Sequence, residues 1–351
     1  MLPVVLFRSP AGEVERIIAP SLTFNEIRGV TGTFRYFGYP SPDERVQAIL
    51  GYSSRIEREV DLGYRHLALF ANRFHVELRL LHERDAAVRF FGLGGESREE
   101  NETNFTLETT GFRGRFGVNV TPTARLSLGE RVEKIEIRRG GVRDLPFVGE
   151  RFPTLPGLGG AVIHAQRVAF TFDTRDSLTT PTRGVAAGAF LEASAEALGS
   201  AANYVRIGGE GVSLNPVFDH RLVLVAHGLV EVLSGDEDTP FVVRPALGGE
   251  DTLRGFGANR FFGDGRLLLN LEARVRMLRL ELFGVEAEFE GVPFVDLGKV
   301  FTSVGAVHRG RLEVTPGLGF RALTRPNVVG RLDIGVGREG AAIFVGLDYP
   351  F

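Results

Sequence analysis

The chain has 351 residues, of which 24% are charged, and its formal net charge at pH 7 is only −3. That balance argues against nucleic-acid binding, and a chain without cysteine has neither disulfides nor thiol or cysteine-ligated metal chemistry. A mean hydropathy of +0.03, with no apolar run near ~18 residues, excludes transmembrane helices but not a transmembrane β-barrel, whose alternating residues average out.

The N-terminal residues 1–21 show no clear strand pattern. Pro3 stands where a signal peptide would carry basic residues, and Arg8 interrupts a short apolar run, so the segment is a poor signal peptide. A barrel protein must cross the inner membrane, and we therefore expect that Met1 replaces a leader. We expect residues 1–21 to be a short lead-in and residues 22–351 to be one barrel domain.

Alternating apolar and polar residues, bounded by turn formers, predict about sixteen strands. They cover roughly residues 22–37, 45–54, 57–70, 72–82, 86–92, 103–120, 124–138, 161–175, 184–197, 203–217, 220–234, 265–277, 283–301, 311–324, 328–339 and 341–351. No helical period competes with this pattern. The predicted fold class is all-β, an antiparallel transmembrane β-barrel of about sixteen strands. The alternative, a soluble β-sandwich, would need bulk water beside the repeated glutamates on one face of every sheet.

The alternation is strictest in residues 265–277 and 283–301. In both segments every second residue is apolar, and the residues between them are mostly ionic. We expect the apolar faces to contact lipid and the charged faces to line a hydrated lumen rather than to serve acid/base catalysis. The side chains expected to face lipid include Leu269, Leu271, Phe289 and Val295.

Four motifs are specific in combination, although each would be weak alone. In chain order they are FTFDTRDSLTTPTRG (170–184), LGGEDTLRGF (247–256), FVDLGKVF (294–301) and the closing GRLDIGVG…IFVGLDYPF. They span residues 170–351, about half of the chain, and their order and spacing resemble the barrel of the BamA/TamA superfamily of outer-membrane assembly and translocation proteins. The resemblance implies an integral β-barrel in the bacterial outer membrane.

Residues 235–264 form a long stretch without strand pattern, which calls for a functional reason. In the family this loop, loop six, folds back into the lumen, where its arginine meets the acid of the F-x-D-x-G strand. The resemblance therefore implies that Arg254 reaches Asp296, with Glu272 as a second partner. An arginine can fork onto one carboxylate and still donate to another acceptor, which lysine cannot do. The motif residues are Leu253, Arg254, Gly255 and Phe256, and their lumen partners are Asp296, Glu272, Phe294 and Gly298.

The stretch DTRDSLTTPTRG has two interpretations. A catalytic carboxylate pair is conceivable, since Asp173 and Arg175 lie on the inward parity of their strand. However, Asp176, Pro181 and Gly184 are turn formers, which favours a structural turn that closes one hairpin, as in the family.

No pattern in the sequence indicates catalysis or metal binding. His66, His75 and His82 lie on neighbouring predicted strands, but their spacing and parities do not converge on a metal site. The nucleophile-elbow, phosphate-loop and zinc-protease motifs are absent. We expect no catalytic residue, metal or cofactor. We therefore expect that the protein is not an enzyme.

The closing residues 341–351 end in an aromatic residue, the form that the assembly machinery of outer-membrane barrels recognises. One face is expected to carry Ile343, Val345, Leu347, Tyr349 and Phe351. Gly346 packs no side chain and Pro350 cannot donate a ladder hydrogen bond, so the seam with the first strand is predicted to open most easily. Alternatively, Pro350 ends the strand at the rim and Gly346 makes room for a lumen side chain.

The leading functional hypothesis is a barrel that inserts or moves proteins, or lipid, across the outer membrane. Its expected partners are outer-membrane lipid, unfolded outer-membrane or secreted proteins, and periplasmic accessory proteins. A passive diffusion channel and the membrane anchor of a larger secreted polypeptide are the alternatives. BamA and TamA carry periplasmic POTRA modules before the barrel, and the predicted strands use nearly all of this chain. Either these modules were removed or the protein is a barrel-only member, which the short lead-in favours and which would put insertase activity in doubt.

Overall fold

The computed structural model describes residues 5–8, 14–25, 29–41, 43–54, 57–218, 221–282, 285–324, 327–346 and 349–351. Almost all regular structure in these residues is β-strand. The helices are single turns: α1 (Leu69–Asn72), α2 (Val148–Arg151) and four short 3₁₀ segments, η1 (Glu99–Asn101), η2 (Glu196–Leu198), η3 (Phe241–Val243) and η4 (Val304–Ala306). No described helix is long and apolar enough to cross a membrane.

One sheet of 17 strands makes up the body of the molecule. Its strands are β1 (Val5–Arg8), β2 (Val14–Asn25), β3 (Gly29–Ser41), β4 (Glu44–Ser53), β5 (Arg58–Ala68), β6 (Phe74–Phe90), β7 (Thr103–Thr121), β8 (Ala124–Arg139), β9 (Ala161–Asp173), β10 (Gly184–Ser194), β11 (Tyr204–Val217), β12 (Leu222–Gly235), β15 (Gly265–Leu282), β16 (Val285–Phe301), β17 (Glu313–Thr324), β18 (Asn327–Gly337) and β19 (Gly340–Gly346). A second sheet pairs β13 (Ala246–Leu247) with β14 (Phe261–Phe262) inside the loop between β12 and β15.

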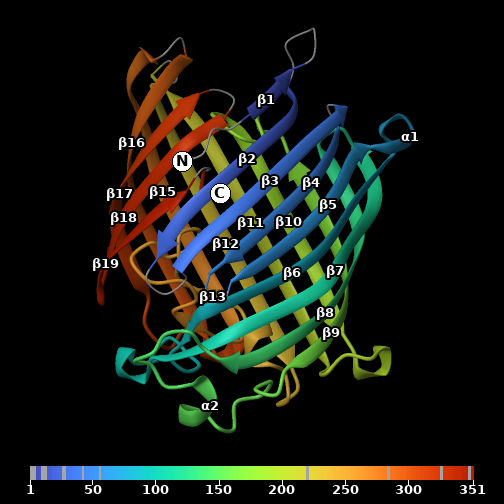
Figure 1. Ribbon diagram of the computed structural model, residues 1–351, viewed down its shortest axis with the longest axis vertical. Coiled ribbons are helices and arrows are strands. Elements are labelled where there is room, and N and C mark those ends of the chain that lie inside the picture. Colours follow the sequence, from blue (N-terminus) through green and yellow to red (C-terminus); the bar gives the residue numbers. More distant parts are fainter. Residues whose placement is uncertain are drawn as a thin grey trace.

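Each strand of the large sheet pairs antiparallel with the next, and β12 pairs directly with β15. Figure 1 shows the strands tilted and rolled into a cylinder, which is the expected antiparallel barrel. The strand order places β19 beside β2, but none of the described residue registers joins β19 to β1 or β2. The described sheet therefore has a seam between its first and last strands.

Two predicted strand boundaries were wrong, and β1 adds a strand inside the expected lead-in, so the large sheet has 17 strands where about sixteen were predicted. The strand expected over 22–37 is two strands, β2 and β3, so the expected lead-in 1–21 contributes residues to the sheet. The strands expected over 72–82 and 86–92 are one strand, β6. Its register shifts between Asp85 and Val88, and the Asp85 carboxylate accepts a hydrogen bond from the backbone of Ala87. Such a bulge interrupts the alternation of apolar and polar residues from which strands are predicted.

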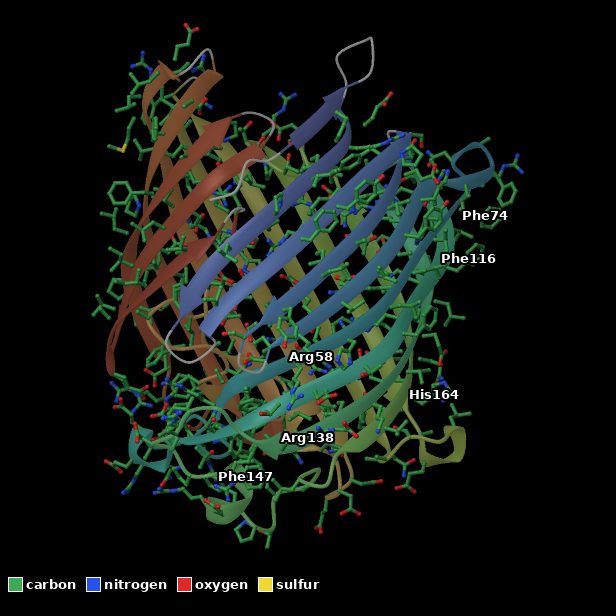
Figure 2. The ribbon with its side chains drawn as sticks, viewed as in Figure 1. Arg58, Phe74, Phe116, Arg138, Phe147 and His164 are labelled. Carbon is green, nitrogen blue, oxygen red and sulfur yellow. The ribbon has the colours of Figure 1, made fainter. Side chains whose placement is uncertain are left out.

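The two faces of the sheet differ as the alternation predicts. Leu269 and Leu271 on β15 are 40% and 39% exposed on the outer face. Asn270 and Glu272, which alternate with them, are buried on the inner face. Figure 2 shows Phe74 and Phe116 on the outer surface, where their rings stack with centroids 5.7 Å apart. The outer face is thus apolar and the inner face is charged.

The two ends of the barrel also differ. The end that carries α2 (Figure 1), here called the loop end, holds a buried apolar cluster, here called the apolar cap. The buried members of this cap are Phe90, Phe105, Val148, Phe241 and Phe262. The opposite end, here called the turn end, holds shorter connections such as residues 122–123 and 174–183.

We predict that Leu269→Arg destabilises the barrel when lipid surrounds it. A guanidinium on the lipid-facing side of a barrel strand costs ~2 to 4 kcal/mol near the bilayer midplane. The free energy of unfolding, measured by urea titration in lipid vesicles, should fall by this amount, while the apolar control Leu269→Phe should change it little. An unchanged value for Leu269→Arg would mean that this face does not contact lipid.

Candidate functional site

Loop six, residues 236–264, folds back from the loop end and packs against the inner face of the barrel. Four of its buried residues form an apolar cluster with Leu268 of β15 and Val300 of β16. Gly248 and Gly249 have φ angles of +116° and +105°, a conformation that glycine adopts without strain, so the loop can turn sharply there. The loop residues in this cluster are Leu247, Leu253, Phe256 and Phe261.

Arg254 at the tip of loop six lies fully buried between two carboxylates of the wall. Its Nε donates to Asp296 Oδ2 at 3.0 Å and its Nη2 to Asp296 Oδ1 at 2.7 Å. Its backbone N–H also donates to Asp296 Oδ2, at 3.0 Å, and its Nη1 donates to Glu272 Oε1 at 2.6 Å. This is the contact that the family resemblance implied.

The wall presents these acids together because β15 and β16 pair in register. Asn270 is opposite Asp296 and Glu272 is opposite Phe294. The Asn270 amide also donates to Asp296 Oδ1 at 2.7 Å, and the Thr315 hydroxyl donates to Asp296 Oδ2 at 3.3 Å. The Phe294 ring lies 3.5 Å from the Arg254 guanidinium carbon, so a cation–π contact covers the face of the cation.

Two glycines of the motifs make room for this docking. A Cβ on Gly298 would lie 2.8 Å from the Leu253 side chain, so the missing side chain leaves space for the loop. A Cβ on Gly255 would lie 2.6 Å from the backbone nitrogen of Gly337 in β18. Loop and wall therefore approach more closely than any larger residue would permit.

Further arginines extend the site beyond the motif residues. Arg321 of β17 is buried and donates to both carboxylate oxygens of Asp333 in β18, at 2.7 and 3.2 Å. Arg274 donates from Nε to Glu272 at 3.0 Å, and Arg331 pairs with Glu250 of loop six. Sequence reasoning missed this extension, although the inward parity of these residues on strands of known direction was a usable signal. The result is a connected lumen network of alternating charge.

The last residues of the chain lie in the lumen rather than on the outer face. Tyr349 donates from its hydroxyl to Glu290 at 2.7 Å, and the Arg274 guanidinium lies 3.8 Å from its ring. The Phe351 ring stacks on His227 of β12, with centroids 4.5 Å apart. The prediction that Tyr349 and Phe351 share one face with Ile343 and Val345 is therefore wrong, because Ile343 and Val345 are exposed on the outer face. Leu347 lies outside the described residues.

Gly346 is the last described residue of β19. A Cβ on Gly346 would lie 2.9 Å from the Arg331 guanidinium, so this glycine makes room for a lumen side chain, as the alternative interpretation held. Pro350 is buried and lies beyond the strand. Aromatic rings of the tail gain cation–π contacts in the lumen that the outer face does not offer.

The segment 174–183 is a connection between β9 and β10 that is closed by its own hydrogen bonds. Asp176 accepts hydrogen bonds from the backbone of Thr182 and Arg183 and from the Thr182 hydroxyl, at 2.9, 3.2 and 2.6 Å. Burial alone would raise the pKa of Asp176, but these hydrogen bonds hold it below its ordinary value. Asp173 pairs with Arg175 at 2.9 Å, and Pro181 is buried in the turn. The acids of this motif are thus occupied in forming the turn.

The three histidines considered as metal ligands have separate partners. His75 bonds Asn119 at 2.9 Å, His82 bonds Thr110 at 2.7 Å, and His66 accepts from the backbone of Ala68 at 3.2 Å. Within the described ranges, no group of three or more His, Asp or Glu is arranged to hold a metal ion.

A comparison with models of protein families identifies the family of this chain. Residues 44–325 match the model of the Omp85 superfamily domain, which is most of the sequence. The chain belongs to the Omp85 superfamily. No curated protein matches the sequence significantly.

Solved structures share the fold of this Omp85 chain. BamA from Haemophilus ducreyi lacking POTRA domains 1–3 aligns with a TM-score of 0.64 and 12% identity, over 99% of this chain and 75% of that one. CdiB from Escherichia coli aligns with a TM-score of 0.64 and 11% identity, over 93% of this chain and 66% of that one. CdiB from Acinetobacter baumannii gives 0.56 and 9%, over 99% and 64%. The chain thus spans about two thirds to three quarters of these proteins.

We predict that Arg254→Lys weakens the docking of loop six. Lysine cannot fork onto Asp296 and reach Glu272 as well, and an unpaired buried acid costs ~3 to 5 kcal/mol where the site is dry and less where water enters. Limited proteolysis should cut residues 236–264 faster in this variant than in the native protein. The control Arg309→Lys changes an exposed loop arginine and should leave the cleavage rate unchanged. Equal cleavage of all three proteins would contradict the docking role of Arg254.

We predict that Gly184→Ala destabilises the turn between β9 and β10. Gly184 has a φ of +107°, and an added Cβ would lie 2.5 Å from the Thr174 carbonyl oxygen. Strain of this kind costs on the order of 1 to 3 kcal/mol. The urea midpoint of unfolding in vesicles should fall, whereas Gly305→Ala, where a Cβ meets nothing within 4 Å, should leave it unchanged.

Proposed function

We propose that this chain inserts other β-barrel proteins into the bacterial outer membrane, with unfolded outer-membrane proteins as its substrates. Its membership of the Omp85 superfamily and the likeness of its fold to BamA support this proposal. The observation that carries it is the seam. β1 pairs with residues 14–18 of β2, and none of the described registers pairs residues 19–25 of β2 on the side away from β3, so this part of the β2 edge is open in the described sheet.

An exposed strand edge offers backbone donors and acceptors to any extended chain that arrives. Addition of a strand to such an edge is a general mode of peptide recognition, because main-chain hydrogen bonds supply affinity for many sequences. A substrate strand could pair with β2 first and then acquire its own neighbours. The alternative of a passive diffusion channel is less favoured, because loop six, the apolar cap and the Tyr349–Phe351 tail all occupy the lumen.

The proposal is tested by reconstituting the purified chain in lipid vesicles. A urea-unfolded eight-stranded outer-membrane barrel is diluted into these vesicles, and its folded fraction is followed by heat-modifiable mobility on gels. The initial folding rate should exceed the rate with empty vesicles several-fold. Equal rates, with the reconstituted chain itself folded, would contradict the proposal. Recovery of the substrate inside the vesicles, protected from protease but not folded in the membrane, would assign translocation instead of insertion.

We further predict that locking the seam abolishes this acceleration. The chain has no cysteine, so Val345→Cys can be combined with Leu22→Cys, which lies on β2 beyond the residues that pair with β1, and the two can be linked with a bis-maleimide. Because the substrate strand needs the edge of β2, a linked seam should reduce the rate to that of empty vesicles. The matched control links Ile334→Cys and Ile343→Cys, a registered pair on β18 and β19, and should retain the acceleration. Full activity with the seam linked would exclude the seam as the entry site.

A further inference from the structure

A group of arginines lines the inner wall of β4 to β7, apart from loop six. Together they border an open cavity of about 300 Å³ whose lining comes only from these four strands. The lining arginines are Arg45, Arg65, Arg79, Arg113 and Arg115, and the one lining acid is Glu77. We propose that this cavity binds acidic side chains of a polypeptide in the lumen, with Arg45 and Arg65 as its principal contacts.

The alternation of the strands places this group on the inner face. On β5 the outward residues Val60 and Leu62 are 37% and 43% exposed, so Arg65 has the opposite, inward parity. The same holds on β4, where Val46 and Leu50 are outward and Arg45 is inward. Both arginines therefore face the lumen and not the apolar outer surface.

Three of the five arginines already have acidic partners. Arg79 pairs with Asp61 at 2.6 Å, and Arg113 pairs with Glu133 at 2.5 Å. Arg115 lies 3.6 Å from Glu77, which is opposite it in the register of β6 and β7. Among the described residues, these ion pairs leave two of the five arginines without a salt bridge.

Arg45 and Arg65 are those two cations. They are directly opposite each other in the register of β4 and β5, where like charges destabilise a sheet. Arg45 donates to the neutral amide oxygen of Gln47 at 2.8 Å, and the buried Nε of Arg65 has no hydrogen-bond partner in the described part of the chain. Glu77 is opposite Arg65 in the register of β5 and β6, but it is shared with Arg115, which lies 3.6 Å away. The cavity therefore keeps an excess of positive charge, and an anion placed between the guanidinium groups of Arg45 and Arg65 would offset their repulsion.

Gly63 keeps the cavity open. A Cβ at this position would lie 2.7 Å from Cγ of Gln47, so a side chain here would fill the space beside Arg65. Both arginines are half-buried, which leaves their guanidinium groups accessible from the lumen. The cavity is therefore wide enough for carboxylate groups and accessible to them.

The position of the cavity favours a polypeptide over a lipid headgroup. The cavity faces the lumen, while the outer face of the same strands is apolar, so a lipid would have to leave the bilayer to reach it. β4 and β5 lie two and three strands from β2, at the seam side of the barrel. Lumen-facing residues and loops of an inserting barrel are polar, and these would pass this wall. This inference rests on the proposed insertion function and adds the acidic segments that it recognises.

The test measures binding alone and does not depend on insertion activity. The purified full chain, in a neutral detergent, is titrated into fluorescein-labelled hexa-aspartate at low salt, where screening is weak, and anisotropy is recorded. The native chain should bind hexa-aspartate and not hexa-asparagine. Arg45→Gln combined with Arg65→Gln should weaken binding by about tenfold, since each lost charge contact in a partly desolvated site reduces affinity several-fold.

The matched control, Arg138→Gln combined with Arg139→Gln, removes the same charge from exposed positions at the loop end of β8 and should bind like the native chain (Figure 2 labels Arg138). Heat-modifiable mobility confirms that each variant is folded, and Arg65→Gln alone replaces the double variant if that one does not fold. Undiminished binding by the folded variant would overturn the proposal. So would phosphatidylglycerol micelles that bind in an Arg65-dependent manner while hexa-aspartate does not, because the site would then serve lipid.

Discussion

The burial of the Arg254 guanidinium is the constraint on which the rest of the lumen depends. Moving a cation out of water costs several kcal/mol, and the structure tolerates it because Asp296 and Glu272 already lie side by side on the paired strands β15 and β16. The close backbone approach at Gly255 and the space at Gly298 follow from the need to bring the loop to these acids. Loop six is therefore held to the barrel wall by these contacts in addition to its own short β13–β14 pairing.

This constraint divides the lumen into two unlike halves. On the side of β15 to β18, arginines and acids alternate until nearly every charge has a partner, and the aromatic tail packs onto the same network through Arg274 and His227. On the side of β4 to β7, Arg45 and Arg65 stand opposite each other beside an open cavity. One half holds the barrel in shape, and the other half presents the cavity that we propose to bind acidic side chains.

Much of this could be predicted from the sequence, because side-chain direction in a strand has a period of two residues. The outward leucines of β15 and the contact of Arg254 with Asp296 follow from parity and from the family motifs. The bulge at Asp85 could not be foreseen, because one inserted residue looks like the end of a strand. The inward position of Tyr349 and Phe351 depends on partners from strands far apart in sequence, Glu290 and His227, which no local pattern reveals.

Arg254 and Asp296 stabilise the folded barrel through their contact with each other. A double-mutant cycle tests this most directly, with Arg254→Ala, Asp296→Ala and the double variant compared by their free energies of unfolding in lipid vesicles. The interaction should give a coupling energy of about 2 kcal/mol or more, in the upper part of the range for residues that share a hydrogen-bonded network. A coupling energy near zero, with both single variants folded, would contradict the account.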